Sequence, residues 1–386
     1  MAGQVRQPID VEALEAWISK TVPEIGVPLD VKQFGYGQSN PTYQLTSPDG
    51  QRYVLRKKPP GKLVSKTAHK VEREHRVIAA LASTDVPIPR AYCLCEDSSV
   101  IGTPFYIMSF LDGRIFEDPS IPGVSPEDRR AIWFDAVRTL AKLHRIDPRD
   151  VKMETFGKNS GFYNRQIATW MAICGAQAAI RDVETGDAVG QLPHFEDMMR
   201  FYSDEKQQPV DRGTLIHGDF KIDNLVFHKT EPRVIGILDW EMSTIGHPLS
   251  DLSNLMTPFY TCRLSTEQLH SAHPGFVPGA TPGLPTLAEI TALYFSVADP
   301  PTRSSGPKAA EDRERERELQ WAQAFNMFRQ SAICQGIAAR HAARQASSEK
   351  ARQYAAARAP LANFAWELVQ GIAQKSGRRS GEKPRL

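Results

Sequence analysis

The feature that most constrains this chain is a set of polar residues placed inside two apolar segments. Residues 215–225 read LIHGDFKIDNL, and residues 235–240 read IGILDW. Asp219, Asn224 and Asp239 follow one another at intervals of five and fifteen residues. Apolar flanks of this kind indicate strands or buried turns, where polar groups need partners. The question is whether those partners are protein groups or a ligand.

Two carboxylates and an asparagine in this order suit phosphoryl transfer. One carboxylate orients the attacking hydroxyl and takes its proton, while an asparagine oxygen and a second carboxylate hold magnesium on the nucleotide phosphates. Protein kinases use an H-R-D-x-x-x-x-N loop and a later D-F-G aspartate for this purpose. Here the loop reads H-G-D-F-K-I-D-N. Because Mg²⁺ commonly takes one or two protein oxygens beside phosphate and water, two protein ligands are enough.

Composition excludes several classes of protein. The chain has 386 residues and a formal net charge of +2, which gives no reason to expect nucleic acid or an anionic membrane as a partner. No apolar run is long enough to span a membrane, and the start, MAGQVRQPID, lacks the apolar core of a signal peptide. We therefore expect no nucleic-acid or membrane partner; the oligomeric state is unknown.

Cysteine usage and the C-terminus bear on location. The five cysteines are an odd number and scattered, which favours reduced structural thiols in an intracellular, cytoplasmic protein. The final residues, Pro384, Arg385 and Leu386, loosely match a peroxisomal signal, which is the alternative.

Strand and helix patterns separate along the chain. Residues 31–47 and 49–61 resemble a hairpin with an Asp-Gly turn, and two more strands are predicted in the first part of the chain. A helix is predicted between these pairs, at residues 62–83. The later helices are predicted at 125–146, 287–296, 313–345 and 355–373. The layout is a small β-rich lobe followed by a larger helical lobe.

Several segments together resemble the aminoglycoside phosphotransferase and choline-kinase-like small-molecule kinases, whose signature is H-G-D-x-x-x-x-N followed by I-D-W or L-D-W. Within this group the chain most resembles the kinase-like domain of acyl-CoA dehydrogenase family members ten and eleven. The resemblance implies an α+β, bilobal, protein-kinase-like fold with a small antiparallel-sheet N-lobe and a larger, mainly helical C-lobe. The matching segments are GQSNPTY, YVLRKKPPG, VEREHRVIAAL, NRQIATW, HGDFKIDNLVFH and LDWEMSTIGHPLSDL.

The resemblance implies a role for each polar residue of the catalytic segment. Asp219 matches the catalytic base, and Asn224 and Asp239 match the Mg²⁺ ligands. Lys221 either neutralises the γ-phosphate or is a solvated lysine. His217 is expected to brace the loop.

The N-terminal segments fit binding of ATP. Gly35 and Gly37 allow the backbone to approach phosphates closely, and the same nucleotide-binding segment includes Gln38, Ser39 and Asn40.

Kinases also need a cation on the third strand, held by a carboxylate of the next helix. By resemblance the cation is Arg56 and the carboxylate is Glu74. Strand alternation puts Arg56 and Lys58 on one face and Lys57 on the other, although which of the three reaches the phosphates stays open.

The segment YIMSFLDG resembles the kinase hinge. There the Ser109 carbonyl and the Leu111 amide would meet the adenine edge. The predicted domains are a nucleotide-binding N-lobe of residues 1–111, and a C-lobe of residues 112–376 with the catalytic loop, metal site and acceptor pocket. A basic tail, residues 377–386, is expected to be disordered.

The sequence therefore predicts an ATP-dependent phosphotransferase that acts on a hydroxyl of a small molecule, with a hydroxyacyl compound as the candidate acceptor. The segments GFYNRQIATWMAICG and MTPFYTCRL, expected near the acceptor, are aromatic and basic rather than acidic, unlike pockets for polycationic antibiotics. Their aromatic residues fit a protein core equally well. The alternative is a pseudokinase that binds a nucleotide or a partner, which Arg56 keeps open because protein kinases use lysine there. A protein kinase is disfavoured because no A-P-E segment follows Asp239.

One residue departs from the family pattern. His247 stands where relatives commonly have an aspartate after glycine. We expect it to change local hydrogen bonding without abolishing metal binding.

Overall fold

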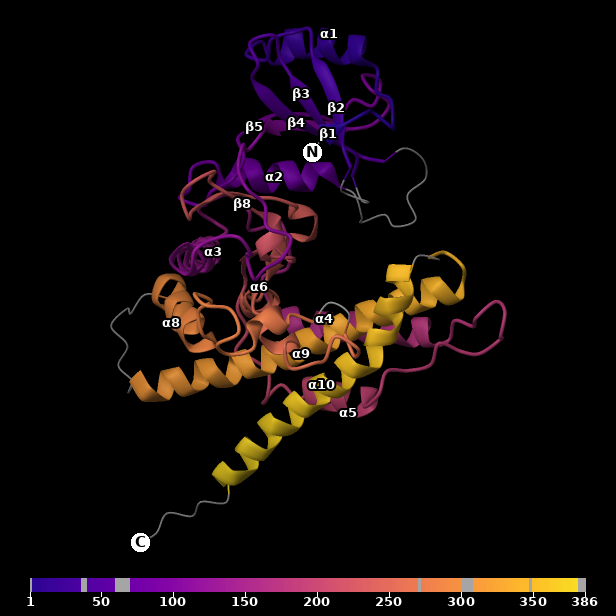
Figure 1. Ribbon diagram of the computed structural model, residues 1–386, viewed down its shortest axis with the longest axis vertical. Helices are drawn as coiled ribbons and strands as arrows, with labels where there is room; N and C mark the ends of the chain where they lie inside the picture. The colour runs from indigo at the N-terminus through magenta and orange to yellow at the C-terminus, as the bar shows by residue number, and fades with distance from the viewer. Residues whose placement is uncertain are drawn as a thin grey trace. The chain divides into compact units, whose positions relative to one another are not determined.

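The computed structural model divides into two compact units (Figure 1). The first unit comprises Met1–Glu117, Ile146–Met153 and His217–Thr244, and the second comprises Asp118–Arg145, Glu154–Ile216 and Ile245–Leu386. The segment with the H-G-D motif thus groups with the N-terminal sheet, whereas the sequence assigns it to a C-lobe beginning at residue 112; the lobe boundaries stay a prediction. The structure describes residues 2–35, 40–59, 70–269, 272–299, 308–346 and 349–380.

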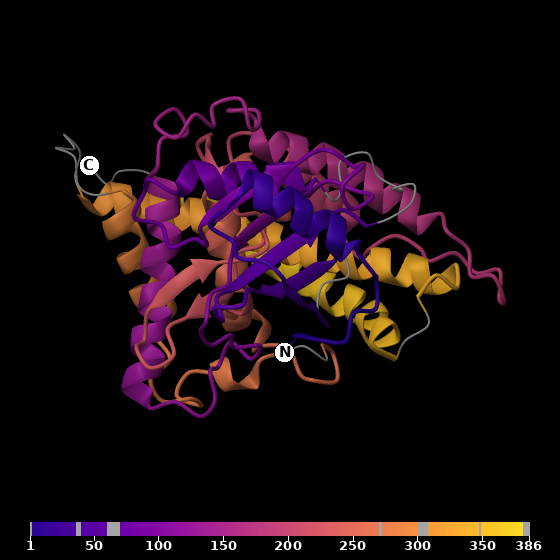
Figure 2. The same cartoon turned by 90° about the horizontal axis from the view of Figure 1, so that it is seen from above.

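The first unit is built on a six-stranded antiparallel sheet in the order β1-β2-β3-β4-β6-β5. Helix α1 (Val11–Thr21) lies across it, as Figure 2 shows from above. The core between them contains Leu14 and Ile18 of the helix and inward-facing side chains of the strands, such as Tyr43 and Phe105. The strands are β1 (Ala2–Gly3), β2 (Asp30–Phe34), β3 (Thr42–Thr46), β4 (Arg52–Lys57), β5 (Ala91–Cys95) and β6 (Phe105–Ser109).

The predicted strand pairing around the Asp-Gly turn is confirmed. Asp49 accepts hydrogen bonds from Ser47 Oγ and the Gln51 amide, and Gly50 adopts a φ of 83°, which suits a residue without a Cβ. The turn sets the register of β3 on β4, with Thr42 opposite Arg56. Side chains alternate across β4, so Leu55 joins the core under α1 while Arg56 faces the other way.

Helix α2 (Val71–Leu81) lies on that other side of β4, where Arg56 contacts it. Its buried stripe contains Val71, Ile78 and Leu81, as predicted, together with one charged residue, Glu74. Val64, expected to extend this stripe, lies outside the described residues.

The segment after residue 216 adds a small hairpin, β8 (Leu225–Phe227) with β9 (Val234–Ile237), each strand adjoining a single 3₁₀ turn. The turns are η1 (Ile222–Asn224) and η2 (Trp240–Met242). Gly113 passes so close to this hairpin that a Cβ there would lie 2.2 Å from the Phe227 carbonyl oxygen. Arg114 and Phe227 exchange two backbone hydrogen bonds of 2.7 and 2.8 Å. These contacts fix the hairpin to the chain that leaves β6.

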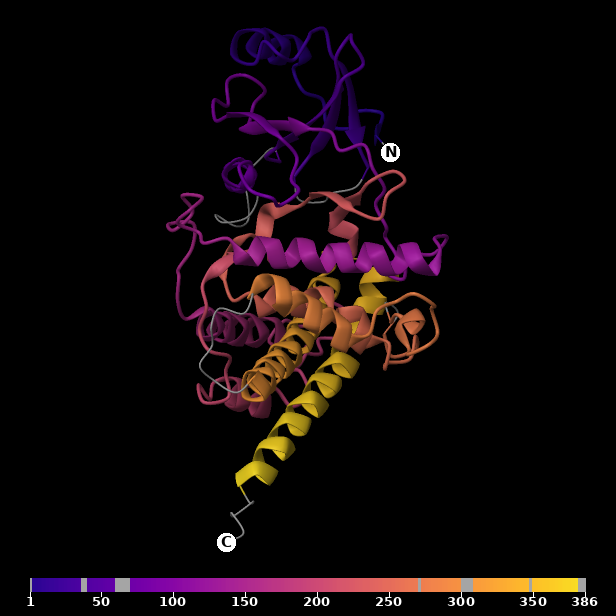
Figure 3. The same cartoon turned by 90° about the vertical axis from the view of Figure 1, so that its left-hand side faces the viewer.

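The second unit is mainly helical, and its long helices α9 and α10 pack against each other (Figure 3). The helices predicted near 125–146, 287–296 and 313–345 are confirmed, and the last helix is longer than predicted. It continues to Ser380, so the tail expected from residue 377 begins as helix. The elements are α3 (Pro126–Arg145), α4 (Phe162–Ala178), α5 (Phe195–Tyr202), β7 (Thr214–Ile216), β10 (Thr244–Gly246), α6 (Leu249–Leu255), α7 (Thr257–Thr261), η3 (Pro274–Phe276), α8 (Leu287–Ala298), α9 (Lys308–Ala342) and α10 (Glu349–Ser380).

Within the described part of the chain, no helix has both the length and the apolar character needed to cross a lipid bilayer.

Candidate active site

A buried ion pair joins β4 to α2. Arg56 Nη1 lies 3.0 Å from Glu74 Oε2, and the two side chains are 12% and 1% exposed. Arg56 Nη2 also reaches Asp239 Oδ1 at 3.4 Å. The guanidinium therefore lies between one buried carboxylate and one that is 41% exposed. Burial opposes the charged form of Arg56, yet its carboxylate neighbours raise its pKa, so it carries a fixed positive charge.

Two further side chains hold Glu74. Asn40 Nδ2 donates to Glu74 Oε1 at 2.7 Å, and the Tyr106 hydroxyl donates to Oε2 at 3.0 Å. Burial raises the pKa of Glu74, whereas Arg56 and these two hydrogen bonds act in the opposite direction. A carboxylate with this many partners is held in one orientation, which in turn fixes the direction of Arg56. Tyr106 was not predicted from the sequence, although its place on β6 opposite Arg56 follows from the strand register.

The lysines beside Arg56 point elsewhere. The Lys57 ammonium lies 6.0 Å above the Tyr43 ring, on the opposite face of β4, and Lys57 is 5% exposed. Burial lowers its pKa. Lys58 pairs with Glu72 of α2. The predicted alternation of Arg56 and Lys57 is therefore confirmed.

Asp239 has an unusual backbone. Its φ of 65° and ψ of 58° are left-handed, a conformation that costs most residues roughly 1–2 kcal/mol but that aspartate tolerates better than most. Strained backbone of this kind recurs at functional sites because it aims a side chain in a direction that regular structure does not allow. Here it follows β9 directly and turns the Asp239 carboxylate toward Arg56.

The residues of the H-G-D loop are connected by short-range hydrogen bonds. Asn224 Nδ2 donates to the Asp219 carbonyl at 2.8 Å and to Asp219 Oδ2 at 3.2 Å. Lys221 Nζ lies 3.6 Å from Asp219 Oδ2 and 3.1 Å from Asp223 Oδ2. Partial burial opposes the charge of Lys221, but the two carboxylates outweigh it and raise the pKa. A cation therefore stands beside the carboxylate of Asp219.

His217 braces this loop, as predicted. Its ring is fully buried, with Nε2 2.8 Å from the Leu238 carbonyl oxygen, and Nδ1 accepts the Asp219 amide at 3.2 Å. The ring also packs on Trp240 with a centroid distance of 4.8 Å. One imidazole thus connects the chain before Asp219 with the chain before Asp239.

Gly218 is required by this arrangement. Its φ is 87°, and a Cβ there would lie 2.4 Å from the Met242 carbonyl oxygen. Any side chain at position 218 would push the loop away from η2. The glycine of the H-G-D motif therefore allows two segments to make close contact.

The donor set can be compared with what Mg²⁺ requires. Both groups that receive hydrogen bonds from Asn224 Nδ2 are oxygens, so the amide orientation is fixed and Oδ1 is turned away from Asp219. An amide oxygen and the half-exposed Asp239 carboxylate are hard oxygen ligands of the type that Mg²⁺ prefers. In the described residues no group of three or more His, Cys, Asp or Glu side chains is arranged around a metal position. The residues fit a site with few protein ligands, completed by phosphate and water.

The other predicted binding residues have different outcomes. Gly37, Gln38 and Ser39 lie outside the described residues. The Gly35 carbonyl accepts a hydrogen bond from Arg6 Nη2 at 3.3 Å. In the predicted hinge, the Ser109 amide donates to the Arg90 carbonyl oxygen, and the Ser109 hydroxyl accepts from the Arg90 amide. The side chain of Leu111, the other predicted hinge residue, packs so closely on Gly236 that a Cβ there would lie 2.0 Å from it. Their role in binding adenine stays a prediction.

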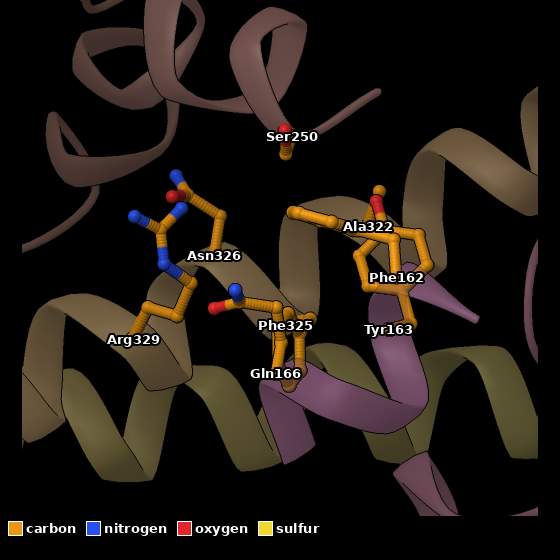
Figure 4. A pocket seen from close by; sticks show the side chains of 8 residues that line it. All are labelled: Phe162, Tyr163, Gln166, Ser250, Ala322, Phe325, Asn326 and Arg329. Carbon is orange, nitrogen blue, oxygen red and sulfur yellow. The ribbon is translucent and has the colours of Figure 1, made fainter. Parts of the chain in front are cut away.

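The second unit contains a small pocket between α4, α6 and α9 (Figure 4). The rings of Phe162 and Tyr163 line one side, while the polar groups of Asn326 and Arg329 lie on the other. Tyr163, from a segment expected near the acceptor, is buried here, and its hydroxyl is without a hydrogen-bond partner in the described part of the chain. Phe259, from the other such segment, packs in the core against the ring of Trp133.

His247, where the resemblance implies an aspartate, caps a helix. Its Nδ1 accepts the Leu249 amide at 3.2 Å at the start of α6, and Nε2 lies 3.1 Å from the Val210 carbonyl oxygen. These partners suit a neutral imidazole with its proton on Nε2. Complete burial lowers the pKa of His247 to about 3, although the hydrogen bond to Val210 acts the other way.

A pH dependence of stability follows from this capping histidine. The unfolded chain binds a proton at His247 below about pH 6.5, whereas the folded chain does not until about pH 3. The contribution of the neutral His247 to the free energy of unfolding is therefore complete above pH 6.5 and is lost as the pH falls toward 3. The loss is about 1.4 kcal/mol per pH unit. Urea unfolding of the wild type and of His247→Asn at pH 7, 6 and 5 measures it. Asn can keep the cap on the Leu249 amide without titrating, so its curve is expected to be flatter, and parallel curves would contradict the neutral cap.

The sheet, helices and site together define a protein-kinase-like fold. The sequence matches the phosphotransferase enzyme family over residues 30–281, and the chain belongs to this family. It is 36% identical to acyl-CoA dehydrogenase family member 11 of Rattus norvegicus, over 98% of this chain and 45% of that protein. It is 38% identical to a probable acyl-CoA dehydrogenase of Arabidopsis thaliana, over 83% of this chain and 38% of that protein. The chain thus spans about half the length, or less, of these curated relatives.

Solved structures agree with this assignment. A Ralstonia eutropha protein, provisionally named an aminoglycoside phosphotransferase, shares 36% identity with a TM-score of 0.76, over 94% of this chain and 99% of that one. An aminoglycoside phosphotransferase in complex with ADP and hygromycin B has the same fold, with a TM-score of 0.52 at 13% identity, over 96% of this chain and 100% of that one.

Proposed function

We propose that this chain is an ATP- and Mg²⁺-dependent phosphotransferase that moves the γ-phosphate to a hydroxyl of a small molecule, and that the acceptor is a hydroxyacyl compound. The observation that carries the proposal is the cluster of Arg56 with Glu74 and Asp239. A buried guanidinium held in one direction, beside a half-exposed carboxylate, suits a polyphosphate and its metal. Within the described residues, the buried Arg56 Nε also lacks a hydrogen-bond acceptor, which a phosphate oxygen can supply.

In this proposal each residue of the loop has a separate task. Asp219 orients the acceptor hydroxyl and takes its proton, and Lys221 offsets negative charge beside it. Asn224 Oδ1 and the Asp239 carboxylate would hold Mg²⁺, which when bound neutralises phosphate charge. Glu74 keeps Arg56 aimed at the phosphates, and the predicted glycine segment and hinge bind the rest of the nucleotide.

Two observations favour an acyl acceptor over an antibiotic. The curated relatives are named acyl-CoA dehydrogenases, so a kinase-like part joined to such an enzyme would act on a related acyl compound. The segments expected near the acceptor, GFYNRQIATWMAICG and MTPFYTCRL, contain no carboxylate. A polycationic drug calls for acidic side chains, whereas an apolar or anionic acceptor does not.

An acceptor screen tests the proposal. ADP release with Mg-ATP is measured for hydroxydecanoyl-CoA isomers, free hydroxydecanoic acids, kanamycin, choline and ribose, with Asp219→Asn as the inactive control. Turnover is expected with the hydroxyacyl compounds. Efficient phosphorylation of kanamycin without turnover of any hydroxyacyl compound would overturn the acceptor class. ATP binding without turnover of any compound would favour the pseudokinase.

A further inference from the structure

One exposed apolar side chain stands out because of where it lies. Met242, the last residue of η2, is 59% exposed, while the first residue of that turn, Trp240, is 1% exposed. Trp240 Nε1 donates to the Ile237 carbonyl at 3.1 Å, so the turn is anchored from inside. Single exposed apolar residues are common on protein surfaces and need no explanation by themselves. The position of Met242 relative to two functional side chains is what makes it informative.

The first of these side chains is Asp219. A Cβ built on Gly218 would lie 2.8 Å from the Met242 Cβ, so the two backbones touch at this point. Gly218 is the residue immediately before Asp219, and its missing side chain is what allows the contact. The backbone and Cβ of Met242 therefore lie against the residue next to the proposed base, Asp219.

The second is Asp239. It immediately precedes η2, and Met242 comes three residues later. The backbone of Met242 is therefore one short turn away from Asp239, as well as in contact with the residue before Asp219.

We propose that Met242 is a specificity-determining residue that contacts the apolar carbons next to the acceptor hydroxyl. This inference rests on the proposed function, because the hydroxyl must meet Asp219. Methionine is flexible and polarizable, so it covers a methylene chain well. A sugar or aminocyclitol would instead place hydroxyl or ammonium groups against it, with loss of their hydration. A hydroxyl within an acyl chain has methylene neighbours and matches this surface.

Three variants test the inference on 3-hydroxydecanoyl-CoA. Met242→Gln keeps the length of the side chain and makes its end polar, and we expect KM for the acyl compound to rise by about tenfold. Met242→Leu should stay close to the wild type. Val183→Gln, at a residue of the second unit that is 70% exposed, is the control for adding a surface amide. KM for ATP should be unchanged in all three, since Met242 is assigned to the acceptor alone.

A binding measurement gives a second readout. Mild peroxide oxidises exposed methionine to the sulfoxide, and mass spectrometry of the peptide that contains Met242 follows the rate. Hydroxydecanoyl-CoA with ADP is expected to slow this oxidation, while ADP alone or ribose is not. Equal rates at a saturating concentration of an acyl compound that the enzyme phosphorylates would overturn the inference.

The outcomes separate the two proposals. If the wild type phosphorylates hydroxyacyl compounds while Met242→Gln keeps the wild-type KM, the assignment of Met242 fails and the kinase function stands. If the wild type turns over no compound of the screen, the proposed function fails and the inference fails with it.

Discussion

Replacing Asp219 by asparagine is expected to lower kcat by about 10²- to 10⁴-fold, the usual contribution of a general base. Asparagine keeps the size of the side chain, and its carbonyl oxygen can still accept the hydrogen bond from Asn224. The loop geometry should therefore survive, and only the ability to take a proton is lost. Steady-state turnover on a confirmed acceptor measures the effect, and calorimetry with AMP-PNP checks that nucleotide affinity is unchanged.

Asp223→Asn is the matched control for this prediction. Asp223 pairs with the same lysine as Asp219 and is equally exposed, at 40% against 39%. If turnover depended only on the charge around Lys221, both variants would behave alike. Wild-type turnover in Asp219→Asn would show that the assigned kinase mechanism is wrong.

Replacing Arg56 by alanine is expected to weaken Mg-ATP binding by roughly 10- to 100-fold, the range for charge-assisted hydrogen bonds to phosphate. The same substitution leaves the buried Glu74 without its cation, which costs about 3–5 kcal/mol of stability. A simple loss of activity would therefore be ambiguous. Calorimetric ATP affinity and thermal unfolding must be measured together for each variant.

A double variant separates folding from binding. Arg56→Leu with Glu74→Gln removes both charges, and the glutamine can still accept from Asn40 through its oxygen and donate to the Tyr106 hydroxyl through its amide. The double variant should stay folded and bind ATP as weakly as Arg56→Ala. Lys57→Ala is the control for loss of a β4 cation, and its ATP affinity should stay normal because Lys57 lies over Tyr43 on the other face. Equal effects of Arg56→Ala and Lys57→Ala would contradict the assigned faces.

Much of this fold can be predicted from local patterns in the sequence. The Asp-Gly turn sets the β3–β4 register, and alternation along β4 separates Arg56 from Lys57. Helix α1 was not predicted, although its signals are present: Asp10 caps it, and Leu14 and Ile18 are spaced four apart. These signals are local in the sequence and are sufficient to predict the helix.

Other parts of the site depend on contacts between distant segments. Tyr106 contacts Glu74, 32 residues away in the sequence, and Met242 contacts Gly218, 24 residues away. No spacing or periodicity encodes such contacts, because they arise only when separate elements pack. The left-handed backbone of Asp239 has the same origin: aspartate permits it, while the packing of Trp240 and His217 selects it.

The position of Arg56 between two carboxylates has an electrical consequence. One guanidinium serves both Glu74 and Asp239, so the three side chains together carry one negative charge. Mg²⁺ held by Asp239 would share this carboxylate with Arg56, whose contact with Oδ1 is the longer of its two, at 3.4 Å. The buried contact with Glu74 at 3.0 Å need not change. The added positive charge would offset the negative charge that Arg56 leaves uncompensated.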